Sequence, residues 1–280
     1  MIIRSRAPTR ISFAGGGTDV PPYCDEHGGC VVSAAINRYA YSTLEPRNDQ
    51  EIHIESGDFL KKLRFLNIDE IIYNNELDIL KAAVKNLNTR RMGFNLFMKT
   101  NVLPGSGLGA SASAFVSLIG LFDHLNGEKM TNYEIAELAH KLEREELKIP
   151  GGKQDQYAAA FGGINFMEFK DGKVWVHPLK IKDNVRLELE KHILLGYLGE
   201  RTAGGGDIIS DQTKTVKSKP EVLEAHHKYK EIALDVKSAL KSGDIIRFGE
   251  LLNEAWQTKK KFSDMISNSK IDQIYDLAMK

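Results

Sequence analysis

The segment Pro104-Gly105-Ser106-Gly107-Leu108-Gly109-Ala110-Ser111-Ala112-Ser113 leads directly into an apolar run that ends near Leu125. Its glycines leave the backbone bare, and the apolar run predicts a buried helix that begins at the last glycine. The N–H groups of a glycine-rich turn and of a helical first turn can converge on one anion. The segment is therefore a candidate phosphate-binding loop, with the Ser111 hydroxyl placed to reach a metal ion on the phosphates.

This loop departs from two common phosphate-binding signatures. It lacks the lysine of the G-x-x-x-x-G-K-[ST] loop. It also lacks the early βαβ unit and the downstream acidic residue that accompany a G-x-G-x-x-G loop, which disfavours a dinucleotide-dependent oxidoreductase. From composition alone, a small-residue loop that lets a helix pack closely on a sheet stays an alternative.

Three motifs taken together resemble those of the GHMP kinases, a family of small-molecule kinases. The loop at 104–113 resembles the second motif of that family, and residues 7–19, which end in G-G-G-T-D, resemble the first. A third match is the run Gly151-Gly152-Lys153-Gln154-Asp155-Gln156-Tyr157 and its continuation to Gly163. The motifs occur in the order of the family and span more than half of the chain.

The first motif also resembles a subgroup within this family. Galactokinases carry G-E-H-T-D, whereas G-G-G-T-D followed by Tyr23-Cys24-Asp25 is similar to kinases of D-glycero-D-manno-heptose 7-phosphate and their fucokinase-like relatives. Glu143 and Asp155 have the spacing that sugar kinases of the family use for a metal-binding glutamate and a catalytic aspartate. Glu143 also borders the apolar stripe of a predicted helix, although a solvated acid in the charged run 143–146 is an alternative from the residues alone.

The resemblance implies ATP and Mg²⁺ as cofactors. Residues Pro104 to Ser111 would bind the ATP phosphates, and Ser111 and Glu143 would hold Mg²⁺, which prefers oxygen ligands. Asp155 would accept the proton of the sugar hydroxyl, and Arg10 would keep Asp155 ionised and steady the transferring phosphoryl group. A surface arginine at the end of a strand is the alternative for Arg10.

The resemblance also implies a substrate site. Asp19 matches a position that binds sugar hydroxyls, while Gly16, Gly17 and Thr18 would put backbone beside the sugar and leave room for a heptose. A phosphate at the far end of the sugar needs a basic group, for which Arg201 and Lys153 are the candidates. Asp19 as a turn cap, and the two basic residues as solvated surface charges, are the alternatives.

The expected reaction is transfer of the γ-phosphate to the anomeric hydroxyl of D-glycero-D-manno-heptose 7-phosphate, giving the 1,7-bisphosphate for nucleotide-heptose synthesis. A fucokinase- or galactokinase-like sugar kinase is an alternative. So is a non-catalytic nucleotide- or sugar-binding relative, because the third glycine-rich motif of the family would begin about where residues 274–280 end the sequence. On this basis we expect the C-terminal domain to be incomplete.

The expected fold class is α+β, as the two-domain GHMP kinase fold: a mixed-sheet N-terminal domain, 1–175, with helices packed on it, and an α+β C-terminal domain, 176–280. Alternation predicts strands, helical spacing and capping residues predict helices, and Asp171-Gly172 predicts a hairpin turn. The predicted strands are 30–36, 39–44, 94–98, 164–169, 174–177 and around 185–198. The predicted helices are 77–87, 111–125, one from the capping box 131–134, 220–242, one after Asp244 and one from 271. Residues 203–207 are expected to form a flexible loop near the site.

Composition excludes several classes of partner. Lys and Arg together number 38, as do Asp and Glu, so no overall charge favours nucleic acid or an anionic membrane. Cys24 and Cys30 lack the partners of a zinc site or a disulfide framework and are expected to be reduced thiols. Without an apolar signal sequence or membrane-spanning run, we expect a cytoplasmic protein, with a homodimer as an open option.

Overall fold

The computed structural model describes residues 1–199 and 204–280, which form two compact units. Unit 1 comprises Met1–Ile11, Ala35–Ile149 and Asp155–Gly163, and unit 2 comprises Ser12–Ala34, Pro150–Gln154 and Ile164–Lys280. The division at residue 175 stays a prediction. The two units are described separately below.

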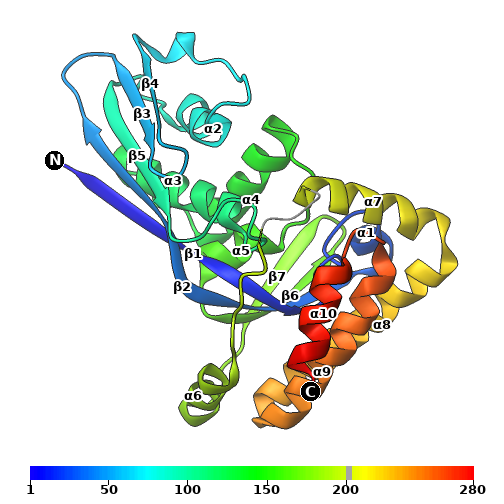
Figure 1. The fold of residues 1–280 in the computed structure, drawn as a ribbon. Coiled ribbons are helices and arrows are strands. Elements are labelled where there is room, and N and C mark those ends of the chain that lie inside the picture. Colours follow the sequence, from blue (N-terminus) through cyan, green and yellow to red (C-terminus); the bar gives the residue numbers. More distant parts are fainter. Residues whose placement is uncertain (200–203) are drawn as a thin grey trace. The chain divides into compact units, whose positions relative to one another are not determined.

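Unit 1 is built on a mixed sheet in the order β4-β3-β5-β2, and β1 also pairs with β2 (Figure 1). The strands are β1 (Ile3–Ala14), β2 (Gly29–Pro46), β3 (Ile52–Ser56), β4 (Lys61–Phe65) and β5 (Phe94–Thr100). β3 runs parallel to β5, whereas β2 pairs with β5 and β3 pairs with β4 in the antiparallel direction. The two strands predicted at 30–36 and 39–44 are one continuous strand, because β2 does not turn between them.

Helices cover the apolar face of the unit 1 sheet. They are α2 (Asp78–Leu87), α3 (Ala110–Asn126), α4 (Asn132–Lys141), the π-helical turn η2 (Leu142–Glu146) and α5 (Gln154–Phe161). Leu96 of β5 faces Leu44 and Ile54 across the sheet, and all three are buried. Phe122 of α3 meets Phe94 edge-on at 5.6 Å between ring centroids. Burial of each such side chain stabilises the unit by roughly 1.5–3 kcal/mol.

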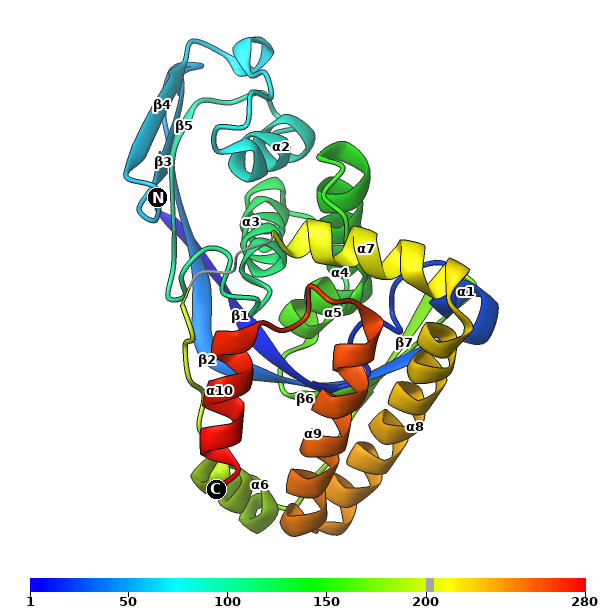
Figure 2. The same ribbon diagram turned by 45° about the vertical axis from the view of Figure 1, so that its right-hand side comes forward.

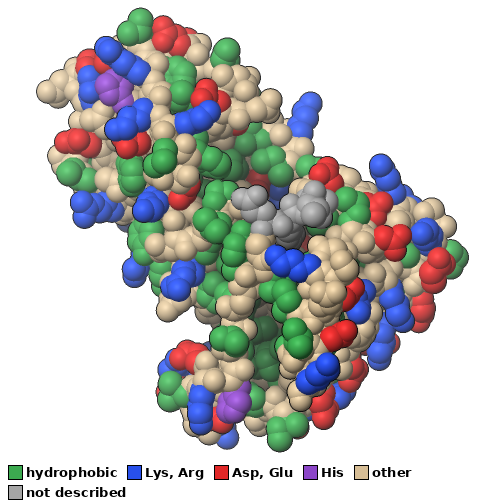
Figure 3. All heavy atoms as spheres, in the orientation of Figure 1, with side chains coloured by type: hydrophobic (Ala, Val, Ile, Leu, Met, Phe, Trp, Pro, Cys, Tyr) green, Lys and Arg blue, Asp and Glu red, His purple; other side chains and the backbone are tan. Residues whose placement is uncertain are grey.

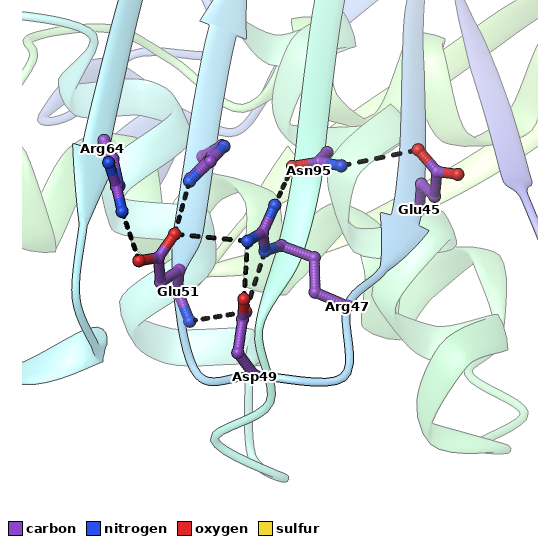
Figure 4. A network of polar contacts seen from close by, with 7 residues as sticks. Glu45, Arg47, Asp49, Glu51, Arg64 and Asn95 are labelled. Carbon is purple, nitrogen blue, oxygen red and sulfur yellow. Dashed lines mark hydrogen bonds and ion pairs between the residues drawn. The ribbon is translucent and has the colours of Figure 1, made fainter.

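The other face of the same strands carries a polar network (Figure 4). Arg47 Nη2 donates to Asp49 Oδ2 at 2.6 Å and to Glu51 Oε2 at 3.2 Å, and Arg64 also pairs with Glu51. Exposed ion pairs of this kind contribute little stability. They do show the alternation of strand side chains, since the neighbouring Ile52 is buried on the opposite face.

Unit 2 contains the predicted hairpin. β6 (Ile164–Lys170) and β7 (Lys173–Pro178) are joined by Asp171 and Gly172, which both have positive φ as a tight hairpin turn requires. The first residues of β2 pair with β6. The helices are α1 (Tyr23–His27), α6 (Asp183–His192), α7 (Gly205–Ser218), α8 (Pro220–Ser242), α9 (Ile245–Lys259) and α10 (Ser269–Ala278). α8 and α9 lie side by side (Figure 2).

Two local predictions in unit 2 are wrong. The strands expected around 185–198 are absent from the described residues: α6 covers the first part, and residues 193–199 form no regular element. Alternating Val185, Leu187 and Leu189 suggested a strand, but Asp183 in the first turn and basic residues in the last turn suit the helix dipole. Likewise, residues 205–207 of the expected loop begin α7.

Charged side chains of both signs are interspersed on the face seen in Figure 3, in agreement with the balanced composition. No described helix is both long and apolar enough to cross a bilayer. Cys24 and Cys30 are free and buried, and burial raises the pKa of each thiol to about 12.

Candidate active site

The predicted phosphate loop precedes α3 in unit 1. Gly105, Gly107 and Gly109 have φ values of +76°, +78° and +75°, a region that other residues rarely adopt. α3 begins directly after Gly109 and has no side-chain cap, so the N–H groups of its first turn are available to an anion. A Cβ at Gly105 would meet no atom within 4 Å. Close packing therefore does not explain the glycine at that position.

Arg10 of β1 joins this loop to Asp155. Its Nε donates to Asp155 Oδ1 at 2.8 Å, its Nη2 forms an ion pair with the same oxygen at 2.5 Å, and its Nη1 donates to the Gly107 carbonyl at 2.8 Å. The Arg10 backbone N–H also donates to the Leu108 carbonyl at 3.1 Å. A Cβ at Gly109 would lie 3.4 Å from the Asp155 carboxyl carbon, so the loop backbone approaches the carboxylate closely. A fork-shaped guanidinium is suited to hold both groups at once.

Glu143, the residue predicted to hold a metal ion, contacts the first turn of α3 through Ser111. Its side chain is 1% exposed, which rules out the solvated acid that the charged run allowed. The Ser111 hydroxyl donates to Glu143 Oε1 at 2.6 Å, and Gln156 Nε2 donates to Oε2 at 2.5 Å. Burial raises the pKa of Glu143, whereas the nearby Arg144 guanidinium and these two donors lower it.

The chemistry of these side chains fits a magnesium ion. A hydroxyl and a carboxylate are hard oxygen donors, and Mg²⁺ in phosphate sites uses one or two protein ligands besides phosphate and water. Within 1–199 and 204–280, groups of three or more His, Cys, Asp or Glu that could hold a metal do not occur. Ser111 and Glu143 therefore suit an ion that phosphate helps to bind, and they do not form a closed structural site.

The π-helical turn η2 places Glu143. α4 begins with the predicted capping box, in which Thr131 and Glu134 bond reciprocally, and it passes directly into η2 at Leu142. The wider turn rotates the following residues relative to a regular helix, and such turns are frequent at functional sites. No residue pattern in the sequence indicated this turn.

Unit 2 contains the predicted sugar-binding residue Asp19, which is 1% exposed. Its Oδ1 accepts from the Gly17 N–H at 2.8 Å and from Gln154 Nε2 at 3.1 Å, and its Oδ2 accepts from the Gln154 N–H at 3.1 Å. A Cβ at Gly152 would lie only 2.0 Å from Asp19 Oδ2. The G-G-K-Q-D motif thus holds the carboxylate of the G-G-G-T-D motif within this unit.

The other predicted substrate residues have mixed surroundings. Thr18 is fully buried, and its hydroxyl donates to the Gly15 and Cys30 carbonyls, so its side chain stabilises the turn. Lys153 Nζ donates to the Gly172 carbonyl of the hairpin turn at 2.9 Å. Gly16 lies beside Gln154, whose Nε2 would be 3.2 Å from a Cβ there. Arg201 lies outside the described residues.

No pattern in the sequence indicated Lys259 of α9. Its Nζ donates to the Gly16 carbonyl at 2.6 Å and lies 4.4 Å from the centre of the Phe262 ring. A Cβ at Gly17 would be 2.7 Å from the same nitrogen. The lysine supports the triple-glycine turn from a position 243 residues away in the sequence. No local sequence pattern predicts a contact between residues so far apart in the chain.

Unit 2 has an open cavity of about 360 Å³. Val20 and Pro21, which follow Asp19, form one wall together with Pro150 and Gly151, and α7 provides Ile209, Ser210, Thr213 and Lys214. This volume is within the range of small-molecule sites. The cavity therefore lies beside the segments that hold Asp19.

A family model described as GHMP kinases N terminal domain matches residues 78–163. A D-glycero-alpha-D-manno-heptose 7-phosphate kinase from Campylobacter jejuni is 38% identical over 99% of this chain and 83% of its own length. The chain belongs to the GHMP kinase family. The resemblance seen in the three motifs is thereby confirmed.

Further members of the GHMP kinase family support the same assignment. The crystal structure of a D-glycero-D-manno-heptose 1-phosphate kinase from Bacteroides thetaiotaomicron superimposes with a TM-score of 0.81 at 35% identity, over 93% of this chain and 80% of that one. A galactokinase from Chloroflexus aggregans is 26% identical over 98% of this chain and 79% of its own length. The α+β fold with a mixed sheet is thus confirmed.

Proposed function

We propose that this chain is an ATP-dependent kinase that phosphorylates the anomeric hydroxyl of D-glycero-D-manno-heptose 7-phosphate in the cytoplasm. The observation that carries the proposal is the Arg10 bridge between Asp155 and the Gly107 carbonyl, because it joins a proton acceptor to a phosphate-binding loop. The heptose is favoured over galactose because the heptose 7-phosphate kinase is 38% identical and the galactokinase 26%.

Phosphoryl transfer requires alignment, charge stabilisation and removal of one proton. The bare N–H groups of residues 105–111 bind the β- and γ-phosphates of ATP. Asp155 accepts the proton of the sugar hydroxyl while the hydroxyl oxygen bonds to the γ-phosphorus of ATP. The bond between the γ-phosphorus and the bridging oxygen of the β-phosphate breaks, and ADP is released. Arg10 pairs with the Asp155 carboxylate and stabilises charge on the transferring group.

Ser111 and Glu143 are the residues that would hold Mg²⁺, which supplies charge neutralisation to the phosphate oxygens when bound. The Ser111 hydroxyl and the Glu143 carboxylate already contact each other at 2.6 Å. Their proximity leaves little rearrangement for ion binding. The contacts between the residues proposed for proton transfer, phosphate binding and metal binding, all within unit 1, favour a kinase over a non-catalytic relative.

The sugar phosphate would bind in unit 2. Asp19 accepts hydroxyl protons of the sugar, and the cavity beside it takes the far end of the substrate. Lys214 at that cavity forms no ion pair with any other described residue, so its ammonium group is available to the distal phosphate. Ser210 and Thr213 of the same helix contribute hydroxyl groups.

The test is a coupled ADP-release assay with ATP and a panel of acceptors: the heptose 7-phosphate, the heptose itself, fucose, galactose and mannose. We expect kcat/KM to be highest for the heptose 7-phosphate, and ³¹P NMR of the product to show a phosphate at the anomeric carbon. Preferential turnover of fucose or galactose would refute the heptose assignment. ADP release with none of the sugars, despite ATP binding, would refute the kinase activity.

A further inference from the structure

Gln156 is a buried side chain of α5 that the mechanism above does not use. It is 0% exposed and follows Asp155 directly, in the first turn of the helix. Its Nε2 donates to Glu143 Oε2 at 2.5 Å, whereas its Oε1 is buried and has no hydrogen-bond partner among the described residues. A buried amide oxygen without a donor is unfavourable, so it requires an explanation.

The orientation of this amide follows from its neighbour. Exchanging the amide oxygen and nitrogen would place Gln156 Oε1 against the Glu143 carboxylate, where two acceptors would repel each other. The Ser111 hydroxyl already donates to the other carboxylate oxygen at 2.6 Å. The unpartnered atom is therefore the Gln156 oxygen, and a donor for it has to come from outside the described residues.

We propose that Gln156 belongs to the divalent-metal site of the proposed kinase, on which this inference rests. Its Nε2 orients the Glu143 carboxylate, and its Oε1 accepts a hydrogen bond from a water molecule bound to the cation. Mg²⁺ in phosphate sites keeps several of its waters, and each of these is a strong donor. The same side chain also connects the metal-binding carboxylate to the segment that begins with Asp155.

The role of Gln156 is that of a positioning residue. Groups that orient metal ligands are themselves important for affinity, and their loss typically weakens metal binding by 10- to 100-fold. A structural amide in a core would behave differently, because its replacement by an apolar side chain of similar length would change stability without changing metal affinity.

The test compares Gln156→Met with wild type in the full chain, with Mn²⁺ as the probe because its bound form is measured directly by electron paramagnetic resonance. Mn²⁺ is titrated in the presence of saturating ADP, and ADP affinity is measured separately in EDTA. We expect the Mn²⁺ dissociation constant to rise by roughly 10- to 100-fold in Q156M. ADP affinity without metal should stay within about twofold of wild type, because no nucleotide contact is removed.

Gln212→Met is the matched control, since Gln212 is a buried glutamine of α7 in unit 2. It should leave Mn²⁺ affinity unchanged. A second measurement does not depend on the folding of a variant: in wild type, the side-chain amide NMR signal of Gln156 should shift with ADP and Mg²⁺ but not with ADP alone.

Two outcomes separate this inference from the proposed function. Tight, ADP-dependent Mn²⁺ binding that is equal in wild type and Q156M, or an amide signal that does not respond to Mg²⁺, would overturn the role of Gln156 and leave the kinase proposal intact. Absence of ADP-dependent Mn²⁺ binding in wild type would overturn the proposed metal site itself, and with it this inference.

Discussion

Replacement of Arg10 by lysine tests the bridge between the proton acceptor and the phosphate loop. Lysine keeps the positive charge but ends in a single nitrogen, whereas the guanidinium reaches Asp155 through two nitrogens and the Gly107 carbonyl through a third. A single ammonium nitrogen cannot occupy the three nitrogen positions of the guanidinium, and we expect two of the three contacts to be lost.

The size of the effect follows from the burial of the pair. A hydrogen bond to a charged group contributes about 1.5–3 kcal/mol, and the lower value is appropriate because the Arg10 and Asp155 side chains are 11% and 22% exposed. Two such contacts amount to about 3 kcal/mol. If this energy is used in the transition state, kcat falls by roughly 100-fold.

The assay is steady-state ADP release with ATP and heptose 7-phosphate, with thermal unfolding to show that the variant folds. Arg6→Lys is the matched control, because Arg6 is on the same strand and its guanidinium lies over the Tyr39 ring, 4.7 Å from the ring centre. We expect normal kcat for R6K. A kcat for R10K within threefold of wild type would refute the bridging role of Arg10.

Four other changes test separate parts of the site. Asp155→Asn should lower kcat at least 100-fold, by roughly the contribution of a positioned base, with little change in ATP binding; an unaltered rate would remove Asp155 as the proton acceptor. Gly152→Ala should raise the KM for sugar and lower stability by about 2 kcal/mol in urea unfolding, because its Cβ would lie 2.0 Å from Asp19 Oδ2; unchanged values would contradict the close packing. Lys214→Met should raise the KM for the heptose phosphate about tenfold but not that for the unphosphorylated heptose, and equal effects on both would exclude a phosphate contact. Burial raises the pKa of Glu143 in the folded state. The free energy of unfolding without metal should therefore fall as pH rises from about 4.3, the ordinary pKa of glutamate, through the pKa of the folded state, and Glu143→Gln should remove this pH dependence in urea titrations. A free energy of unfolding that rises with pH in wild type would show that the hydrogen-bond donors around Glu143 outweigh its burial.

Much of unit 1 could be predicted from local patterns. The helices at 77–87 and 111–125 and the capping box at Thr131 are confirmed within one or two residues, because periodicity and capping depend on neighbours along the chain. The prediction of strands around 185–198 was wrong because alternation of apolar and polar residues over a short segment also fits the exposed helix α6, in which only Leu189 is buried.

The candidate site likewise contains some residues that the sequence indicated and others that only the structure revealed. The motifs indicated Asp155 and Asp19 as functional residues, and the spacing to Asp155 indicated Glu143. The structure places Asp155 and Glu143 against the predicted phosphate loop and buries Asp19. Lys259 and the unpartnered oxygen of Gln156 were not indicated, because a lysine near the end of a helix and an amide beside a catalytic acid are ordinary in sequence.

The amino-acid sequence by itself determined the backbone of the predicted phosphate loop, since glycine is the residue that adopts positive φ without steric cost, and it determined the family through the order of its motifs. Tertiary structure alone decided which side chains meet. The bond from Arg10 to Asp155 joins residues 145 positions apart, and that from Ser111 to Glu143 joins residues 32 apart. Contacts at such separations depend on how sheet and helices pack, and the protonation and orientation of Glu143 depend on the burial that this packing produces.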